Sequence, residues 1–501
     1  MPTRHPALAL AAVTALVAAA GGLADRTADA AAGCLPSGTD ATINAALAGA
    51  NAQAVLCPGA VFTLTNPVTF TAPGQRLLTQ GLPTDGTRAV LRVTGGALTT
   101  AINGNNQPGV VVENVEVDGN RPALGQLTGG ALLEMGGAGT DQTVRAVVAH
   151  DTRSWSTVHL IEGAVTGGVP QCQRATVVDN TIGPAGTDEP AGTWADGISL
   201  ACGDSLVANN TVQDATDGGI VIFGAPGSTV RDNRITAVSR QLLGGINLVD
   251  YAPMDGNYTG TVVTGNVIDG SGDLIKVGIA MGPQVWGCGT GTNHGASVTG
   301  NTVQGQNVAY GYAVNGVSDW TVTGNVDTAR HVGALGGGCG GTPSRPGAFQ
   351  YQAATASTLQ PQFAAATLTY VLGVSEPGIL RAAGPVPGCR AGAGQGLYPG
   401  QAVTSCDGRF TLALQQDGNL VLRQGDTALW STGTTGRAVP TATAIMQGDG
   451  NFVLYDAASA AVWASGTSGQ PGADLVLQDD GTLVVYSPAG VPLWASNTCC
   501  H

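Results

Sequence analysis

The chain has 501 residues, which is enough for two or three domains. Its formal net charge of −14 argues against nucleic acid and anionic membrane surfaces as partners. Charged residues make up only 11 % of the chain and Gly occurs 77 times, a composition typical of a turn-rich, mainly β protein rather than a helical one.

The first 32 residues have the pattern of a secretory signal peptide. Arg4 and His5 precede an apolar run from residue 7 to residue 20, and small residues follow near residue 30 as cleavage sites. The run is short for a membrane span, so we expect no span and a secreted, extracellular protein. Residues 31–34 (Ala-Ala-Gly-Cys) resemble a lipoprotein attachment site, but charged residues separate this cysteine from the apolar run, which favours a soluble exported protein.

The ten cysteines are an even number, as expected for disulfides in an oxidising compartment. Cys172 and Cys202 each lie eight residues before an asparagine of a repeated phrase, so they occupy equivalent repeat positions and are expected to pair. No CxxC pair or histidine cluster with metal spacing occurs, so no metal site is expected. The other expected pairs are Cys34 with Cys57 and Cys288 with Cys339, whereas Cys389, Cys406, Cys499 and Cys500 allow several connectivities.

The segment after the signal begins with a predicted short amphipathic helix at residues 43–47 and strands at 55–56 and 61–64. Further along, one short phrase around an asparagine returns at intervals of 23 to 35 residues from Asn180 onward. A second phrase, which ends in Gly-Ile, alternates with it. The phrases are centred on Asn114, Asn180, Asn210, Asn233, Asn266, Asn301 and Asn325, and on Ile198, Ile220, Ile246 and Ile279.

Short β-branched strands, a period of this length and stacked asparagines are typical of a right-handed parallel β-helix. Residues 33–345 are predicted to form this solenoid, and their phrases resemble the pectate-lyase-like superfamily. A leucine-rich repeat is the competing solenoid, but the spaced leucines that it needs are missing.

Aligning the four isoleucines predicts which side chains meet on coils about 4.8 Å apart. The alignment places Asp196 and Asp217 close together, with Lys276 in the column of Asp217 two coils further on. His159 falls in the preceding coil, in the column of Ser199 and Asn247. Other polar and aromatic residues gather on this stretch, several of them in the long loop 183–195: Asp188, Glu189, Trp194, Asp250 and Tyr251.

Two neighbouring carboxylates beside aromatic residues are the groups that glycoside hydrolysis needs. The Asp-Gly-Ile phrases look similar to those of β-helix hydrolases such as polygalacturonases and α-1,3-glucanases, although no complete family motif matches. The candidate catalytic residues are Asp196, Asp217, Asp250, His159 and Lys276.

Other functions remain open for the solenoid. A polysaccharide lyase or epimerase would use Lys276 as a base with Ca²⁺ on the acids, and otherwise no cofactor is expected. Alternatively, the Asp-Gly pairs are ordinary turns, and the solenoid is a spacer in a non-catalytic lectin or adhesin. A protein toxin or inhibitor is a further alternative.

Residues 346–395 are rich in Gly, Pro and Ala and are expected to form a capping segment and a linker. Residues 368–374 are a predicted strand within this segment, and residues 392–396 the linker itself.

The last part of the chain, residues 396–501, repeats a nine-residue pattern three times, with first glutamines 32 and 31 residues apart. Each copy contains an Asp-Gly turn signal between alternating apolar residues, so each is predicted to be a β-hairpin. A tryptophan follows each copy beside aliphatic residues, and is expected to pack in a shared core. The copies are Gln415-x-Asp417-x-Asn419-x-Val421-x-Arg423, Gln447-x-Asp449-x-Asn451-x-Val453-x-Tyr455 and Gln478-x-Asp480-x-Thr482-x-Val484-x-Tyr486.

Strand alternation places the motif residues on one polar face and the leucines between them in the core. Amide donors, carboxylate acceptors and an aliphatic side chain together suit the hydroxyls and ring carbons of a hexose. This pattern resembles the bulb-type (monocot) mannose-binding lectins, which implies a β-prism with pseudo-threefold symmetry that binds mannose-containing glycans without metal. The second copy keeps every motif residue, whereas Arg423 and Thr482 depart from the pattern.

The sequence as a whole predicts a secreted carbohydrate-active protein, in which a lectin module targets a glycoside hydrolase to a polysaccharide. It leaves the polysaccharide, the bond cleaved and the oligomeric state open.

Overall fold

The computed structural model describes residues 33–187, 193–333, 344–368, 370–374, 388–392, 394–447, 449–456 and 460–500. The predicted signal peptide, residues 1–32, lies outside the described residues, and so do Asp188 and Glu189. Within the described part of the chain, no helix is long and apolar enough to cross a bilayer. The helices are α1 (Asp40–Ala46), α2 (Arg121–Leu124), α3 (Pro283–Trp286) and the 3₁₀ turn η1 (Val371–Gly373).

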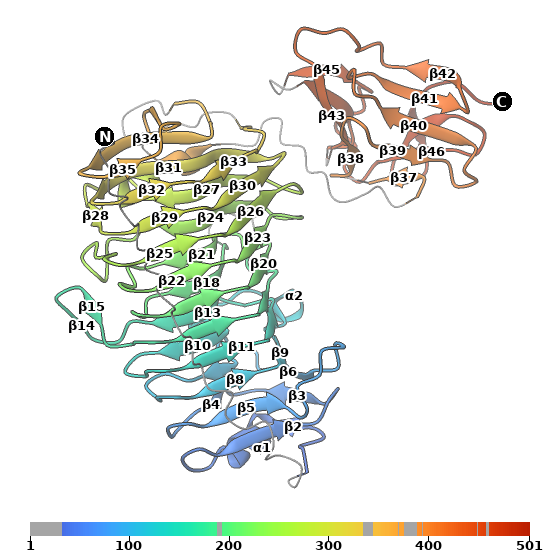
Figure 1. Ribbon diagram of the computed structural model, residues 1–501. Coiled ribbons are helices and arrows are strands. Elements are labelled where there is room, and N and C mark those ends of the chain that lie inside the picture. Colours follow the sequence, from blue (N-terminus) through green and yellow to red (C-terminus); the bar gives the residue numbers. More distant parts are fainter. Residues whose placement is uncertain are drawn as a thin grey trace, which may run out of the picture.

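The larger part of the molecule is a parallel β-helix, in which successive coils stack along one axis (Figure 1). Each coil contributes one strand to each of three sheets, and the strands pair in parallel with those of the next coil. The first sheet contains β2 (Gln53–Leu56), β5 (Arg76–Thr79), β8 (Val111–Glu113), β11 (Thr143–Arg145), β16 (Thr176–Val178), β19 (Leu206–Ala208), β22 (Thr229–Arg231), β25 (Val262–Thr264), β29 (Ser297–Thr299), β32 (Thr321–Thr323) and β35 (Thr358–Leu359).

The other two sheets follow the same order along the axis. The second sheet contains β1 (Gly38–Thr39), β3 (Val61–Leu64), β6 (Ala89–Val93), β9 (Val115–Asp118), β12 (Val148–His150), β17 (Thr181–Ile182), β20 (Thr211–Gln213), β23 (Arg234–Thr236), β26 (Val267–Gly270), β30 (Thr302–Gly305) and β33 (Val326–Asp327). The third contains β4 (Val68–Thr69), β7 (Ile102–Asn103), β10 (Leu133–Gly136), β13 (Ser156–Ile161), β18 (Asp196–Leu200), β21 (Gly218–Ile222), β24 (Leu242–Leu248), β27 (Ile275–Met281), β31 (Val308–Ser318), β34 (Phe349–Thr355) and β36 (Ala364–Ala365), with β28 (Asn293–His294) beside β31; β14 (Val165–Thr166) and β15 (Val169–Pro170) form a hairpin outside the sheets.

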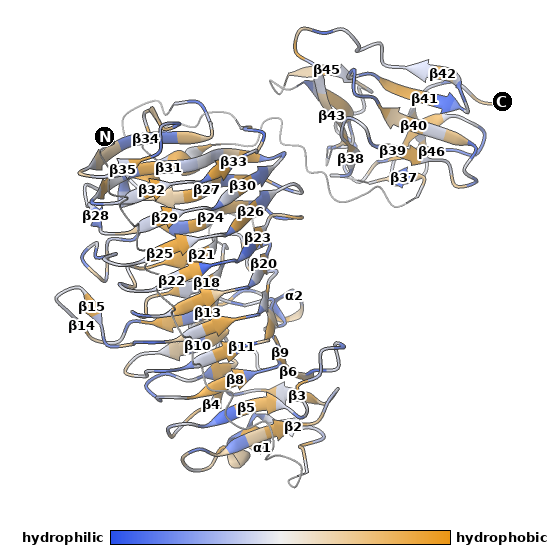
Figure 2. Cartoon of the chain, in the orientation of Figure 1, coloured by the Kyte–Doolittle hydropathy of each residue, from blue (hydrophilic) through white to orange (hydrophobic). Residues whose placement is uncertain are grey.

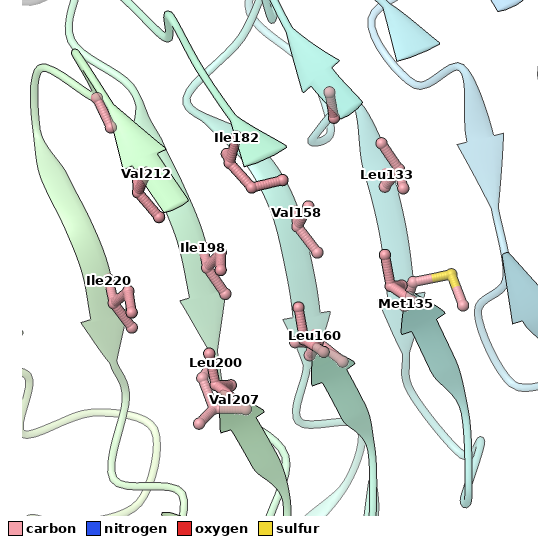
Figure 3. Close-up of a cluster of buried hydrophobic side chains, with 14 of the residues drawn as sticks. Leu133, Met135, Val158, Leu160, Ile182, Ile198, Leu200, Val207, Val212 and Ile220 are labelled. Atoms are coloured by element: carbon pink, nitrogen blue, oxygen red, sulfur yellow. The ribbon is translucent and has the colours of Figure 1, made fainter. Parts of the chain in front are cut away.

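The interior of the solenoid is filled by columns of aliphatic side chains, one from each coil. Val158, Ile198 and Ile220 occupy one such column on β13, β18 and β21, and Leu160 and Leu200 occupy the next (Figure 3). All five are at most 1 % exposed. Hydrophobic and hydrophilic residues alternate along many of these strands (Figure 2), because one face of each strand points into the core.

The repeated asparagines form a buried ladder at a bend of the coil, as the sequence predicts. Asn210 donates from its backbone N and its Nδ2 to Asn233 Oδ1, at 2.9 and 2.8 Å. Asn233 in turn donates from Nδ2 to Asn266 Oδ1 and to the Val207 carbonyl. The same contacts continue to Asn325, where Gln360 Oε1 accepts from the Asn325 backbone N. The coils from Asn180 to Gln360 therefore hydrogen-bond to one another through side chains as well as backbone, whereas Asn114 lies outside this ladder and donates from Nδ2 to the Pro83 carbonyl.

The ends of the solenoid differ from the predicted boundaries. α1 begins three residues before the predicted helix, at Asp40, and its buried Ile43 closes the first coil. The third sheet continues through β34 and β36, so the β-helix extends to about residue 365 rather than 345. The predicted strand at 368–374 is wrong, because the 3₁₀ turn η1 lies there instead. Leu368, Val371 and Val374 are buried against the outside of the solenoid, so side-chain packing rather than pairing with a sheet holds this segment.

Residues 390–495 form three antiparallel four-stranded sheets, each built around one copy of the nine-residue pattern. Gly418, Gly450 and Gly481 close the three tight turns with φ between 82° and 89°, a conformation that favours glycine. The sheets are β39 (Ala402–Thr404), β40 (Phe410–Leu414), β41 (Leu420–Gln424) and β42 (Thr427–Ser431); β38 (Gly396–Leu397), β43 (Thr441–Met446), β44 (Phe452–Asp456) and β45 (Ala461–Ala464); and β37 (Arg390–Ala391), β46 (Asp474–Leu477), β47 (Leu483–Tyr486) and β48 (Pro492–Ala495).

The three sheets share one core, as their sequence pattern predicts. Leucines that precede or lie between the motif residues, such as Leu412, Leu477 and Leu454, are buried in it. Trp430, Trp463 and Trp494 meet edge to face with ring centroids 5.3–5.6 Å apart and pack against this core. The predicted start at residue 396 and the predicted linker at 392–396 are both wrong, because β37 already pairs with β46 and Gly396 lies in β38.

The disulfides Cys34–Cys57 and Cys172–Cys202 confirm two of the three predicted pairs. Cys288 is also disulfide-bonded, while Cys339 lies outside the described residues. Cys389 pairs with Cys406. Cys499 and Cys500 are exposed free thiols.

Candidate functional site

The predicted register of the third sheet is confirmed. Ile198 lies opposite Ile220, which lies opposite Ile246, and that residue lies opposite Ile279. His159 lies opposite Ser199, as predicted. The polar residues that precede or follow these isoleucines therefore lie on neighbouring coils of one sheet.

In the Asp-Gly-Ile phrase, both the glycine and the isoleucine face the interior of the solenoid, which is possible because glycine has no side chain. A Cβ on Gly197 would lie 2.5 Å from Val212 Cγ1 of the core, and a Cβ on Gly219 would lie 2.4 Å from Ile235 Cγ2. Because Gly197 and the following isoleucine both occupy the interior, Asp196 and Ser199 project from the outer face. The phrase thus has a structural cause, and its consequence is an outward carboxylate at the start of β18.

Asp196 is held rigidly on this face. Ser199 Oγ donates to Asp196 Oδ2 at 2.7 Å, and the Gly218 backbone N donates to Oδ1 at 3.2 Å. Ser156 Oγ on the preceding coil lies 2.7 Å from Ser199 Oγ, which extends the hydrogen-bonded chain. Asp196 is only 4 % exposed, so its carboxyl is fixed and almost sealed from water.

Three aspartates on consecutive coils influence one another electrostatically. Burial, followed by the negative charges of Asp217 and Asp250, raises the pKa of Asp196 well above its usual value. Burial raises the pKa of the half-buried Asp217 to about 6. Burial, with a contribution from Asp217, raises the pKa of Asp250 to about 7. Asp250 therefore joins Asp196 and Asp217, the two residues that the isoleucine register predicts to be neighbours. The pKa of each of the three carboxyls is raised, so each binds its proton more tightly than a free aspartate does.

Asp250 follows β24, and its backbone carbonyl is hydrogen-bonded to a buried tyrosine. Tyr258 Oη donates to the carbonyls of Ile222 and Asp250, at 2.6 and 3.0 Å. Tyr258 is fully buried, and its burial raises the pKa of its own hydroxyl, so it stays a donor. The loop that carries Asp250 is thus tied to the preceding coil.

Asn247 is a buried amide that has no hydrogen-bond partner among the residues that the structure describes. Its side chain is 1 % exposed, yet neither Nδ2 nor Oδ1 is bonded. A Cβ on Gly244 would lie 2.0 Å from Asn247 Oδ1, and a Cβ on Gly218 would lie 2.6 Å from Nδ2 and 3.5 Å from Asp196 Oδ1. The two glycines therefore leave space beside Asp196 into which this amide points. An unsatisfied buried amide is costly, and in a functional site it is available to bind a ligand.

His159 and two aromatic side chains border the aspartates. His159 Nδ1 lies 2.5 Å from Glu134 Oε1, and its ring meets Trp155 edge to face with centroids 4.7 Å apart. Trp155 is 38 % exposed and its carbonyl accepts from the Asp196 backbone N. Tyr251, next to Asp250, is 44 % exposed. Trp155 is not among the residues predicted from the sequence, although its position directly before β13 places it in register with the residue before Asp196.

Lys276 lies in the predicted column but is directed elsewhere. Its Nζ donates to the Leu372 carbonyl of η1 at 2.9 Å. The segment around η1 covers the outer face of β27 and β31 through Leu368, Val371 and Val374. Lys276 thus fastens this covering segment.

A separate group on the second sheet, Asp118, His150 and Asp151, has potential metal-binding atoms within 4.8 Å of one another. Asp118 already accepts from Arg92 Nε and the Asn120 backbone N, and Asp151 Oδ2 lies 2.7 Å from His150 Nδ1. The hydrogen bond with Asp151, and then the charges of Asp118 and Glu116, raise the pKa of His150. These contacts satisfy the group internally, as an ion-pair network does.

In the second copy of the C-terminal pattern, the polar motif residues lie together on the outward face near the turn, a surface called the polar shelf below. Gln447 Nε2 donates to Tyr455 Oη at 2.8 Å, and Asp449 Oδ1 accepts from the Asn451 backbone N. Asn451 Oδ1 accepts from Ser465 Oγ and the Thr467 backbone N, which fixes the amide so that Nδ2 remains a donor. Oxygens of Asp449 and the Asn451 amide are therefore oriented at the same turn.

The other two copies differ from the second. Gln478 Nε2 donates to Tyr486 Oη at 2.7 Å, but the buried Thr482 hydroxyl has no hydrogen-bond partner within the described ranges. Asp417 Oδ2 accepts from Thr435 Oγ1, and Arg423, which replaces the tyrosine, donates to the Asp426 carbonyl in the first copy. In all three copies the motif valine, Val421, Val453 or Val484, is 2–3 % exposed, which leaves little of it to contact a sugar ring.

Residues 158–327 match the family model described as the right-handed beta helix region. No curated protein matches the chain. Among solved structures, the chain is similar to monomeric monocot mannose-binding lectins from Gastrodia elata, with 38 % identity over 22 % of this chain and 98 % of that chain and a TM-score of 0.21. The mannose-specific agglutinin from snowdrop (Galanthus nivalis) bulbs complexed with methyl-α-D-mannoside is 34 % identical over 23 % of this chain and 99 % of that chain, with a TM-score of 0.19. The Japanese Marasmius oreades lectin is 34 % identical over 22 % of this chain and 92 % of that chain, with a TM-score of 0.21. The family match and the three parallel sheets together place a right-handed parallel β-helix in this chain.

Proposed function

We propose that this chain is a secreted carbohydrate-active protein, in which residues 390–500 bind mannose-containing glycans and the β-helix hydrolyses a polysaccharide. The C-terminal module is, in this proposal, a bulb-type lectin: a β-prism of three sheets related by pseudo-threefold symmetry. The observation that carries the hydrolase proposal is the group of three aspartates with raised pKa values on consecutive coils.

Mannose binding is supported by the arrangement of the second copy. The Asp449 carboxylate accepts hydrogen bonds, the Asn451 amide donates them, and the Gln447–Tyr455 pair supplies both kinds of group. This mixture matches the vicinal hydroxyls of a hexose, and no metal is required. Such a shallow site binds one sugar weakly, so polyvalent mannan should be bound more tightly by avidity.

Glycan arrays and calorimetry on the full chain test this assignment. The Asp449→Asn variant should lose most binding of methyl α-mannoside, because the amide replaces an acceptor by a donor. The exposed Asp426→Asn variant, which changes an aspartate outside the motifs, is the control. Full mannose binding by Asp449→Asn, or no binding of mannan by the unmodified protein, would contradict the assignment.

Hydrolysis requires one protonated and one ionised carboxyl group. The acid gives its proton to the glycosidic oxygen as the C–O bond breaks, and the base takes a proton from the water that bonds to the anomeric carbon. Asp250, with its pKa about 7, suits the acid, and Asp217, with its pKa about 6, suits the base near neutral pH. Asp196 is the positioning residue, since it is buried and already accepts two hydrogen bonds.

The flanking side chains give this site further glycan-binding groups. Trp155 and Tyr251 expose aromatic surface next to Asp196 and Asp250, and aromatic faces pack against sugar rings. The unpartnered Asn247 amide offers one donor and one acceptor to a hydroxyl group. Lyase chemistry has less support, because the Lys276 ammonium group is engaged by the Leu372 carbonyl.

The test is a panel of cell-wall polysaccharides, assayed for new reducing ends and for unsaturated products. We expect reducing ends only, with kcat lowered about 100-fold or more in Asp217→Asn and Asp250→Asn. Asp196→Asn should instead lower kcat by less and leave the pH–rate profile nearly unchanged, because the raised pKa of Asp196 keeps its carboxyl uncharged near neutral pH. The exposed turn variant Asp179→Asn is the matched control. If no polysaccharide is cleaved, the solenoid is a spacer and the protein is an adhesin; unsaturated products would indicate a lyase.

A further inference from the structure

The outward face of the third C-terminal sheet continues beyond its motif residues. On β46, Asp474 and Val476 alternate with the buried Leu475 and Leu477, so they share the outward face with Gln478. Asp474 lies directly opposite Tyr486, the last residue of the motif. The polar shelf of this copy therefore extends from the turn at Asp480 past Tyr486 to the far end of the sheet.

An arginine and a hollow surface lie at that far end. Arg390 of β37 pairs with Val476, and its Nε lies 3.2 Å from Asp474 Oδ2. Tyr486, Ser487 and Pro488 border the same cavity, whose volume is about 440 Å³. This volume lies in the range of small-ligand sites and is enough for a monosaccharide unit. The Arg390 side chain is 61 % exposed, so its remaining N–H groups face the cavity and solvent.

The Arg–Asp pair is peculiar to the third copy. The residue two positions before the motif glutamine has a different cross-strand partner in each copy. Val476 of the third copy pairs with Arg390, whereas Ile445 of the second pairs with Gly396 and Ala413 of the first pairs with Ala402. Thr443 and Thr411 stand at the positions equivalent to Asp474. The first and second copies therefore lack an Arg–Asp pair at the equivalent positions, although in the first copy Arg423 lies opposite Thr411.

We infer that the third copy binds an oligosaccharide rather than a single sugar, with a second neutral hexose unit in the cavity beside Arg390. The first unit would contact Gln478, Asp480 and Tyr486, and Tyr486 adjoins both units. Arg390 then donates to hydroxyl groups of the second unit and Asp474 accepts from them. This inference rests on the proposed mannose binding of the module.

The charge of the cavity favours a neutral sugar. The Arg390 guanidinium is already paired with the Asp474 carboxylate, so the pair adds no net charge. A uronic acid or a phosphate group would meet the Asp474 carboxylate, whereas vicinal hydroxyls match one donor and one acceptor side by side. The Thr482 hydroxyl also cannot replace the asparagine amide of the second copy, so this copy needs contacts beyond the first sugar.

Calorimetry on the full chain separates the third copy from the second. In an Asp449→Asn background, which silences the second copy, we expect mannotriose to bind about tenfold more tightly than methyl α-mannoside. Arg390→Ala in that background should abolish this preference and leave the affinity for methyl α-mannoside unchanged. Arg437→Ala removes an exposed arginine outside the motifs and should change neither affinity.

Several outcomes would overturn the inference. It is wrong if mannotriose and methyl α-mannoside bind equally in the Asp449→Asn background, or if Arg390→Ala keeps the preference. Tighter binding of a trisaccharide that ends in a uronic acid, lost in Arg390→Ala, would contradict a neutral ligand. Failure of the unmodified protein to bind either mannoside would instead refute the proposed mannose binding itself. Near-ultraviolet circular dichroism checks that the variants are folded.

Discussion

At the scale of single residues, the three aspartates make the folded state sensitive to pH. A carboxyl whose pKa is raised on folding binds its proton more tightly in the native state, so the stability it confers is present below about pH 4 and is lost as pH rises through its folded pKa. For Asp217 this window ends near pH 6, and for Asp250 near pH 7. Above these values the native state contains neighbouring buried negative charges.

We therefore expect Asp217→Asn to raise the melting temperature at pH 8 and to leave it nearly unchanged at pH 4. The neutral amide removes a charge whose burial costs on the order of 1–3 kcal/mol at pH 8. Thermal unfolding at the two pH values measures the difference between variant and unmodified protein, which cancels the titration of other groups. Asp179→Asn is the control. A variant that is less stable at pH 8 would show that the Asp217 carboxylate is satisfied in the fold.

Asn247 offers a second prediction at this scale, because its amide has no hydrogen bond to any residue in the described part of the chain. Replacing it by leucine of similar size removes two unsatisfied polar atoms, so stability should be kept or slightly increased. If the amide binds substrate, kcat/KM on the cleaved polysaccharide should fall about tenfold or more. Unchanged kcat/KM, or a clear loss of melting temperature, would show that Asn247 has a structural role instead.

At the scale of the element, the asparagine ladder joins consecutive coils. Replacing Asn233 by alanine would leave the backbone N and Nδ2 of Asn210 without their acceptor. Each buried donor left unpaired costs about 1–3 kcal/mol, so we expect the variant to lose roughly 2–5 kcal/mol of unfolding free energy. Denaturant titration measures this loss, with the exposed Thr211→Ala as the control. Equal effects of the two substitutions would contradict the role of the ladder.

At the scale of the whole molecule, two modules with different tasks share one chain. If the C-terminal sheets bring the β-helix to a mannan-bearing surface, the double variant Asp449→Asn/Asp480→Asn should cleave soluble oligosaccharides at the normal rate. On particulate cell walls its rate should fall about 10-fold or more, because the local concentration of enzyme is lost. Product release from the two substrates, measured side by side, tests the coupling; equal rates on particulate walls would show that the modules act independently.

The sequence by itself determined the periodic features. The isoleucine register, the asparagine ladder and the Cys172–Cys202 pair follow from residues that recur once per coil, because stacking brings equivalent positions together. The alternating leucines and the tryptophan cluster of the C-terminal sheets follow from the two-residue period of a strand in the same way.

Only the tertiary structure decided the features that have no period. The solenoid runs past residue 345 because β34 and β36 continue its third sheet without the asparagine phrase. Lys276 donates to a backbone carbonyl of η1, which lies far along the chain. Arg390 meets Asp474 because β37 crosses to the third sheet. Loops and covering segments are placed by long-range packing rather than by local pattern, so their contacts were visible only in the folded molecule.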